Sequence, residues 1–212
     1  MIVVIGQPAL RLTADGPEAA GSAARIAMSA AGRGAPVQLI GKVGEDPDGD
    51  ALVLALARAD VGHVALLRDS GRRTPQLIDA PDDLDETAPQ LTPPDPTERP
   101  QVDAADVDLG LRYLTEFRVI VVVQAIDAEL GRVVSEAAAY GAATLIALVP
   151  DGTSAPDSLP DNALVLAAPP EDPDGAFDRL VGDLAAAIDA GTDPQRAFRD
   201  LVAGVGWEPA GA

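Results

Sequence analysis

Cysteine is absent from the sequence and histidine occurs once, as His63. Without cysteine the chain cannot form disulfides or thiolate metal sites, and one imidazole excludes any site that needs two. A Ser-His-Asp arrangement would have to use His63, which lies between a predicted helix and a predicted strand. We interpret it as an ordinary boundary residue.

Positive charge and long apolar runs are also scarce. The sequence has 34 acidic and 15 basic residues, a formal charge of −19 at pH 7. This excess repels phosphate backbones and anionic lipids, so we expect neither nucleic acid nor membrane as a partner. No segment approaches the length of a membrane span, and the apolar N-terminus lacks the basic flank of a signal peptide. A cytoplasmic protein is therefore predicted.

What the sequence does contain suits one globular domain over residues 1–212. Its length and its 47% hydrophobic content allow a sizeable buried core. Residues 79–105 differ, because Pro, Asp, Glu and Thr dominate there and too little apolar area is available for folding. We predict a flexible, exposed acidic loop, which could recruit a basic partner.

Outside this loop, apolar runs alternate with amphipathic segments. The runs typical of buried strands are 2–5, 37–40, 119–124, 143–149 and 163–167. The segments typical of helices are 19–33, 48–59, 106–117, 127–140, 175–190 and 194–203. This alternation predicts an α/β fold with three layers, a doubly wound, mostly parallel sheet, and a ligand site outside the carboxyl ends of the strands. Two further short strands, 64–67 and 76–78, could pair as a hairpin.

Two stretches of the sequence resemble a known family. The run Gly-Lys-Val-Gly-Glu-Asp-Pro-Asp-Gly-Asp at 41–50, with the preceding residues from Ala20, resembles the first signature of the ribokinase/PfkB carbohydrate kinases. Residues 172–178, Asp-Pro-Asp-Gly-Ala-Phe-Asp, are similar to the second signature, Asp-Thr-Thr-Gly-Ala-Gly-Asp. The resemblance implies a ribokinase-like fold. It also shows a departure, because the segment between Ala167 and Asp172 is far shorter than the family's.

The second signature implies roles in phosphoryl transfer. Asp178 matches the family's catalytic base, and Gly175, Ala176 and Phe177 match the backbone N–H groups that form its anion hole. Phe177, however, stands where the family has a second glycine. Its benzyl side chain would crowd the space that phosphate oxygens need.

The sugar side departs from the family as well. The positions that the resemblance assigns to substrate binding hold Arg11, Gly21, Arg25, Gly41 and Lys42. The two arginines replace an aspartate and an asparagine that bind sugar hydroxyls in the family. Because guanidinium groups prefer carboxylate or phosphate, this change either abolishes binding or redirects it to a small anionic ligand. Alternatively, both arginines are solvated or paired with acids such as Asp15 and Glu18.

The positions that bind metal and nucleotide in the family also depart from its pattern. Where the family carries Asn-x-x-Glu, the chain reads Pro170-Glu171-Asp172-Pro173, and proline cannot coordinate a metal. We predict no metal ligands and interpret the acids at 171–178 as helix caps, with weak Mg²⁺ binding as the alternative. The short segment after Ala167 also removes strands that carry much of the family's nucleotide site. ATP and Mg²⁺ are expected as cofactors only if the chain is active.

These departures predict a degenerate homologue of the sugar kinases that binds or interacts without catalysis. The alternative is an active ATP-dependent kinase of a small sugar-like hydroxyl compound, with Asp178 as base. Since residues 6–21 are shorter than in the family, we expect a reduced lid over the sugar site, with the 64–78 hairpin as its remnant. Lid strands commonly pair between subunits in the family, so this hairpin is a candidate homodimer contact.

Overall fold

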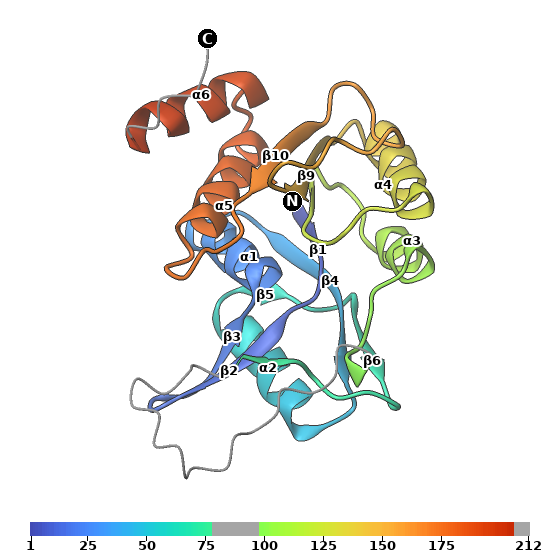
Figure 1. Cartoon of the computed structure of the whole chain (residues 1–212), viewed down its shortest axis with the longest axis vertical. Helices are drawn as coiled ribbons and strands as arrows, with labels where there is room; N and C mark the ends of the chain where they lie inside the picture. The colour runs from blue at the N-terminus through green and yellow to red at the C-terminus, as the bar shows by residue number, and fades with distance from the viewer. Residues whose placement is uncertain (78–97, 206–212) are drawn as a thin grey trace.

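A parallel sheet of seven strands forms the centre of the structure, a computed structural model that describes residues 1–77 and 98–205. Every strand pair in this sheet is parallel. Its strands, labelled in part in Figure 1, are β1 (Ile2–Ile5), β4 (Val37–Gly44), β5 (Val61–Gly62), β6 (Leu66–Asp69), β8 (Val119–Val122), β9 (Thr144–Pro150) and β10 (Leu164–Ala168). Five of these strands, β1, β4, β8, β9 and β10, confirm the five apolar runs.

The strand order reverses at β1. The order is β10-β9-β8-β1-β4-β5, with β6 pairing separately with β4. The chain thus builds outward from β1 through β4 to β5, and later returns to the other side of β1 with β8, β9 and β10. Such a reversal leaves a crevice at the carboxyl ends of the strands, which is where open α/β sheets place ligands.

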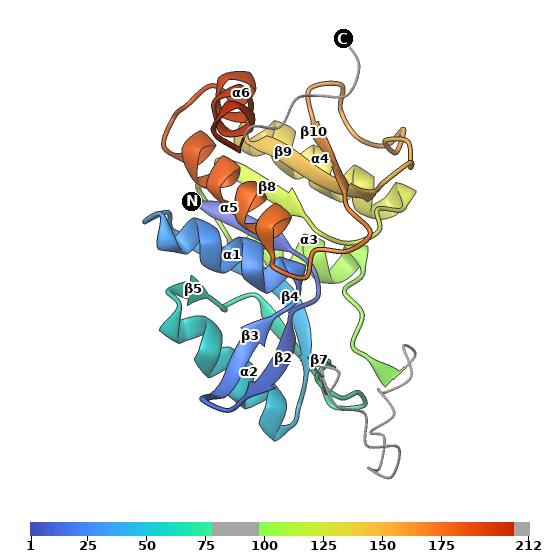
Figure 2. The same ribbon diagram turned by 60° about the vertical axis from the view of Figure 1, so that its left-hand side comes forward.

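Helices cover both faces of the sheet, as Figure 2 shows. One face carries α1 (Ser22–Gly32), α2 (Pro47–Arg58), α5 (Ala176–Asp189) and α6 (Pro194–Val205). The other carries α3 (Ala104–Tyr113) and α4 (Ala128–Gly141). The predicted three-layer, doubly wound architecture is confirmed. No helix within 1–77 or 98–205 combines the length and apolar character needed to cross a bilayer.

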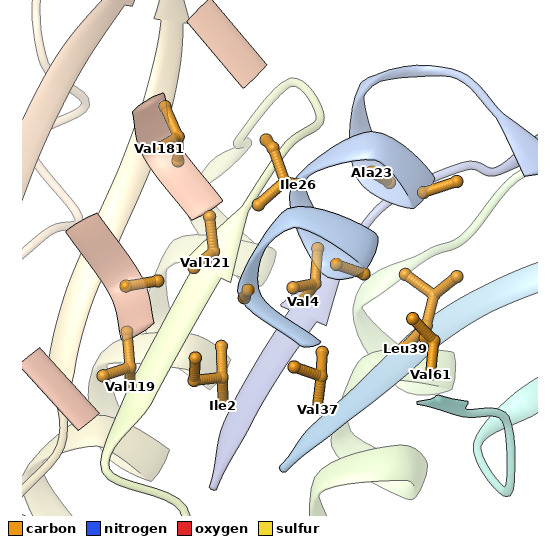
Figure 3. Close-up of a cluster of buried hydrophobic side chains, with 14 of the residues drawn as sticks. Ile2, Val4, Ala23, Ile26, Val37, Leu39, Val61, Val119, Val121 and Val181 are labelled. Atoms are coloured by element: carbon orange, nitrogen blue, oxygen red, sulfur yellow. The ribbon is translucent and has the colours of Figure 1, made fainter. Parts of the chain in front are cut away.

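The strands are buried on both faces because their side chains alternate between two cores. Ile2 and Val4 of β1 lie on the side of the sheet that α1 and α5 cover, in one buried cluster with Ile26 and Val181, as Figure 3 shows. Val3 and Ile5 point the other way, into the core under α3 and α4. All four β1 side chains are fully buried, which explains why this strand reads as a continuous apolar run.

The small sheet beside the main one corrects the predicted lid. It has the order β3-β2-β7, from β2 (Ala9–Thr13), β3 (Gly16–Ala20) and β7 (Gln76–Leu77). β2 and β3 form an antiparallel hairpin, in the segment that we expected to be trimmed. The predicted helix 19–33 accordingly begins only at Ser22.

The predicted 64–78 hairpin is wrong. β6 pairs with β4 in the large sheet, and β7 pairs with β2 in the small one, so the two strands belong to different sheets. A dimer contact through residues 64–78 stays a prediction, although the hairpin that was to carry it does not form. Ile78, the last residue of the predicted second strand, lies outside the described residues.

The predicted acidic loop 79–105 lies mostly outside the described residues, which resume at 98. Its last residues are helical, because α3 begins at Ala104, two residues before the expected start. Asp103 caps this helix by accepting from the N–H of Asp106, while the Asp106 side chain accepts from the N–H of Asp103. This reciprocal pair satisfies free N–H groups at the helix start. The partner-binding role of the loop stays a prediction.

The acidic half of the first signature, residues 44–50, has a structural role. The carboxylate of Asp46 accepts from the N–H of Gly49 at 2.8 Å, from the N–H of Thr74 at 2.9 Å and from the Thr74 hydroxyl at 2.6 Å. The same hydroxyl accepts from the N–H of Gly44 at 3.0 Å. Asp46 therefore caps α2 and ties the end of β4 to the loop before β7.

Replacing Asp46 with asparagine is expected to lower the free energy of unfolding at pH 7 by about 1.5 kcal/mol, because part of this hydrogen bonding is lost. Burial alone would raise the pKa of Asp46, but hydrogen bonds from Thr74 and Gly49 and the charge of Arg68 outweigh it and hold the pKa below its ordinary value. The stabilisation is therefore complete above the ordinary pKa near 4 and is lost as the pH falls through the lower folded-state pKa.

Urea denaturation of wild type and Asp46→Asn between pH 7 and pH 2.5 measures this effect. The difference between the two proteins should shrink below about pH 4. Asp15→Asn, on the exposed turn of the β2–β3 hairpin, is the control and should behave as wild type. A constant difference across the pH range would contradict the role of the Asp46 charge.

Candidate functional site

A cavity of about 430 Å³ lies at the carboxyl ends of β8, β9 and β10, on one side of the point at which the strand order reverses. Its wall includes Ser22 at the start of α1 and Phe177 and Asp178 at the start of α5. Two regions distant in sequence, both within the signature-like stretches, thus meet beside one cavity.

Asp178, the residue that matches a catalytic base, is held in an ion pair with Arg25. Arg25 Nε donates to Asp178 Oδ2 at 2.7 Å. The Asp178 side chain is only 2% exposed and that of Arg25 is 26% exposed, so the pair is largely removed from water. Arg25 therefore pairs with an acid, as one sequence interpretation held, but with Asp178 on α5 in place of Asp15 or Glu18.

The N–H groups at the start of α5 are occupied by another carboxylate. Asp172 accepts from the N–H of Phe177 at 3.2 Å through Oδ1 and from the N–H of Asp178 at 3.1 Å through Oδ2. Burial raises the pKa of Asp172, but these bonds, a further one from Ala176 and the charge of Arg25 outweigh it and hold the pKa below its ordinary value. The interpretation of Asp172 as a helix cap is confirmed.

Gly175 and Phe177 shape this helix start. Gly175 has a left-handed backbone with φ +64°, and a Cβ there would lie 3.1 Å from Arg25 Cδ. A glycine therefore lets the chain turn closely around the arginine. Phe177 is half-buried, packs against the core under α1 and α5, and also lines the cavity.

The Arg25–Asp178 pair is the first of several polar contacts along the α1–α5 seam. One turn further along α1, the hydroxyl of Ser29 donates to Asp183 Oδ1 at 3.1 Å. One more turn along, Arg33 donates to both carboxylate oxygens of Asp183, through Nε at 2.8 Å. The hydrogen bond from Arg33 is the main reason that the pKa of Asp183 lies below its ordinary value. The seam thus fixes the position of α5 relative to α1.

Lys42 and Gly41, predicted to bind substrate, lie at the carboxyl end of β4. Lys42 Nζ lies 2.5 Å from Asp106 Oδ2 and joins β4 to the start of α3. A Cβ on Gly41 would lie 2.9 Å from the carbonyl oxygen of Gly6 and 2.9 Å from Pro8 Cδ. Both residues therefore have structural explanations, and their substrate roles stay predictions.

Gly21 and Arg11 complete the predicted substrate set. Gly21 has φ +83° and precedes α1 without a side-chain cap. Arg11 lies on β2 of the small sheet, opposite Glu18 in the hairpin register. Arg11 thus lies on a strand of the small sheet, whereas Arg25 lies on α1 and pairs with α5.

The acids near α5 do not converge as metal ligands. Among the described residues, no group of three or more His, Asp or Glu side chains is arranged to hold a metal ion. The oxygens of Asp172 face N–H groups, and one oxygen of Asp178 faces Arg25. The carboxylates of Asp172 and Asp178 therefore already accept hydrogen bonds from donors within the chain.

Sequence reasoning placed Asp178, Arg25 and Phe177 at a site but missed how they interact. It also missed Gln124 and Asp151, which line the cavity from the loops after β8 and β9. The general rule that ligands bind at the carboxyl ends of parallel strands could have directed attention to both loops.

No family model matches the sequence, and no curated protein matches it significantly. Solved structures do match. The ribokinase of Arabidopsis thaliana, complexed with ribose and ATP, superposes with a TM-score of 0.64 at 14% identity, over 95% of this chain and 90% of that one. The fructokinase of Xylella fastidiosa gives 0.53 at 17% identity, over 94% of this chain and 68% of that one. With its parallel sheet, its strand order and these matches, the chain has the fold of the ribokinase-type sugar kinases.

Proposed function

We propose that this chain is a non-catalytic relative of the sugar kinases whose fold it shares, and that it acts by binding rather than by phosphoryl transfer. The observation that carries the proposal is the 2.7 Å ion pair between Arg25 and the 2%-exposed Asp178. This ion pair links the position of the family's catalytic base to a position that binds sugar hydroxyls in the family.

A general base must come within hydrogen-bonding reach of the hydroxyl whose proton it takes. In this chain a guanidinium already donates to the Asp178 carboxylate. A sugar hydroxyl would have to displace Arg25 and leave its charge half-buried without a partner, which is costly. The pair therefore opposes the approach that catalysis needs.

The phosphate side supports the same proposal. The carboxylate of Asp172 accepts the N–H groups of Phe177 and Asp178, which a transferring phosphoryl group would otherwise use. An incoming phosphate would meet a like charge at that place, and the described cavity lining contains no lysine or arginine to offset it. The residues present therefore do not fit a triphosphate.

An active kinase that uses ATP and Mg²⁺ is the second candidate. The observation in its favour is that Asp178 does line a cavity at the start of α5, where the resembling family has its base. Activity would require Arg25 to leave Asp178 and Asp172 to leave the helix start when substrates bind. The two candidates thus differ in whether ligands can break these contacts.

Thermal unfolding and ADP release, each measured with millimolar ATP·Mg and a panel of sugars and sugar acids, separate the candidates. We expect no rise in melting temperature and no sugar-dependent ADP release. A ligand that binds only the folded state at about one hundred times its Kd would add about 2.7 kcal/mol, which is easily detected. Asp178→Asn is the control and should give the same background ADP release. A sugar-dependent rate at least tenfold above that of Asp178→Asn would overturn the proposal.

A further inference from the structure

Four Asp-Gly dipeptides occur in the sequence, at 15–16, 48–49, 151–152 and 174–175. Because glycine lacks a Cβ, its backbone nitrogen can approach the side-chain carboxyl carbon of the preceding aspartate. The attack forms a bond between the glycine N and the aspartate Cγ, and one carboxyl oxygen leaves as water with the amide proton and the carboxyl proton. Water then opens the succinimide ring at either carbonyl carbon, which regenerates aspartate or gives isoaspartate. The reaction therefore needs no reagent other than water.

The fold holds two of these dipeptides at helix starts. At the start of α2, the N–H of Gly49 donates to Asp46 Oδ1 at 2.8 Å. Before α5, the N–H of Gly175 donates to the carbonyl oxygen of Asp172 at 3.1 Å. Both glycines are also buried. An attack by either nitrogen must first break its hydrogen bond and open the start of a helix, which local unfolding makes infrequent.

The dipeptide at 15–16 is held by the small sheet. Gly16 pairs with Thr13 at the end of the β2–β3 ladder, and the Thr13 hydroxyl donates to the carbonyl oxygen of Gly16 at 2.9 Å. Asp15 itself is exposed in the turn between them. The aspartate is thus open to water, but rotation of the Gly16 backbone toward it would break the end of the ladder.

The dipeptide at 151–152 is the one that the fold leaves open. Asp151 and Gly152 are both exposed, and a Cβ on Gly152 would meet no atom within 4 Å. Within the described ranges 1–77 and 98–205, neither the Asp151 side chain nor the Gly152 N–H has a hydrogen-bond or ion-pair partner. The N–H of Thr153 donates to the carbonyl oxygen of Pro150 at 3.0 Å, so the two residues form the tip of a turn. Nucleophile and carboxyl are therefore adjacent and free.

We propose that Asp151 is a site of spontaneous covalent modification, at which the folded protein converts aspartate to isoaspartate through a succinimide. The modification adds one methylene to the main chain directly after β9 and leaves the former backbone carboxyl as a short branch. Asp151 lines the cavity at the carboxyl ends of β8, β9 and β10, so the change falls on the wall of that cavity. The inference does not depend on whether the chain is catalytic.

Peptide mapping of wild type after several weeks at pH 7 and 37 °C tests the proposal. Endoproteinase Asp-N cleaves before aspartate but not before isoaspartate, so a peptide 127–156 should replace the peptides 127–150 and 151–156. Cleavage before Asp15, Asp48 and Asp174 should persist. We expect isomerisation at Asp151 to be at least about fivefold faster than at each of these three, because their glycines are held by the fold.

The same incubation in denaturing urea is the control for the fold. All four dipeptides should then react at similar rates, because their chemistry is the same. Asp151→Asn gives a second readout, since an asparagine in this turn should lose ammonia and change the mass of the chain. Asp174→Asn is its matched control and should keep its mass. Equal rates at Asp151 and Asp174 in the folded protein, or no reaction at Asp151 while the urea sample reacts there, would overturn the proposal.

Discussion

Replacing Arg25 with alanine is expected to lower the free energy of unfolding by about 3 kcal/mol. The variant leaves Asp178, a carboxylate 2% exposed, without its guanidinium partner in a site that water reaches poorly. Uncompensated buried charge is among the few mechanisms that give a large effect from one substitution. Urea denaturation at pH 7, followed by circular dichroism, measures the change.

Arg33→Ala is the matched control for Arg25→Ala. Arg33 directly follows α1, and its side chain is 64% exposed in its pair with Asp183. An exposed pair is screened by water and salt, so this variant should lose far less stability than Arg25→Ala. Equal losses in the two variants would show that the burial of Asp178 does not matter.

A double-mutant cycle isolates the pair itself. Arg25→Ala, Asp178→Ala and the double variant should give a coupling energy of at least about 1 kcal/mol, because the residues are in direct contact. If the two single effects simply add, the ion pair contributes nothing and the argument against Asp178 as a base loses its physical ground. Arg25→Met with Asp178→Leu completes the test, since a buried pair replaced by packed apolar groups can approach wild-type stability.

The sequence predicted the large sheet because its signals are local. Val119–Val122 and Ile2–Ile5 are continuous apolar runs, and a buried parallel strand needs no information beyond its own residues to be recognised. Helix ends were nearly as well defined where a cap is present, as at Asp127, whose side chain accepts from the N–H of Leu130. Both kinds of prediction depend on neighbours within a few positions.

The small sheet shows where local reasoning was misapplied. Asp15-Gly16 lies at the turn between β2 and β3 and is a strong hairpin signal, so the β2–β3 hairpin was readable from the sequence. Comparison with the length of the family's lid led instead to a predicted loss. The pairing of β6 with β4 was not readable, because a four-residue strand carries no signal for its partner.

The contacts within the candidate site could not be predicted from the sequence. Asp178 and Arg25 were each identified from signature positions, yet 153 positions separate them and nothing local indicates that they form a pair. Asp172 was interpreted as a cap, but which N–H groups it meets depends on the turn at Gly175. The site residues could therefore be identified from the sequence. That Arg25 and Asp178 neutralise each other became visible only from the packing of α1 on α5.

That packing depends on Gly182, and Gly182→Ala is expected to lower the free energy of unfolding by about 2 kcal/mol. A Cβ at this position would lie 2.6 Å from Ser29 Cβ and 2.7 Å from the carbonyl oxygen of Ile26, so α5 must move away from α1. Alanine favours helices over glycine by up to about 1 kcal/mol, which makes a net loss diagnostic of the clash. Urea denaturation measures it.

Gly32→Ala provides the control, because Gly32 ends α1 and a Cβ there would meet no atom within 4 Å. This variant should be as stable as wild type or slightly more stable.

The Gly182→Ala variant also tests the Arg25–Asp178 pair. If α5 moves, the 2.7 Å contact between Arg25 and Asp178 lengthens, so the cost of Arg25→Ala should be smaller in the Gly182→Ala background than in wild type. An unchanged cost would mean that the pair forms independently of the seam, and that Arg25 follows Asp178 wherever α5 places it.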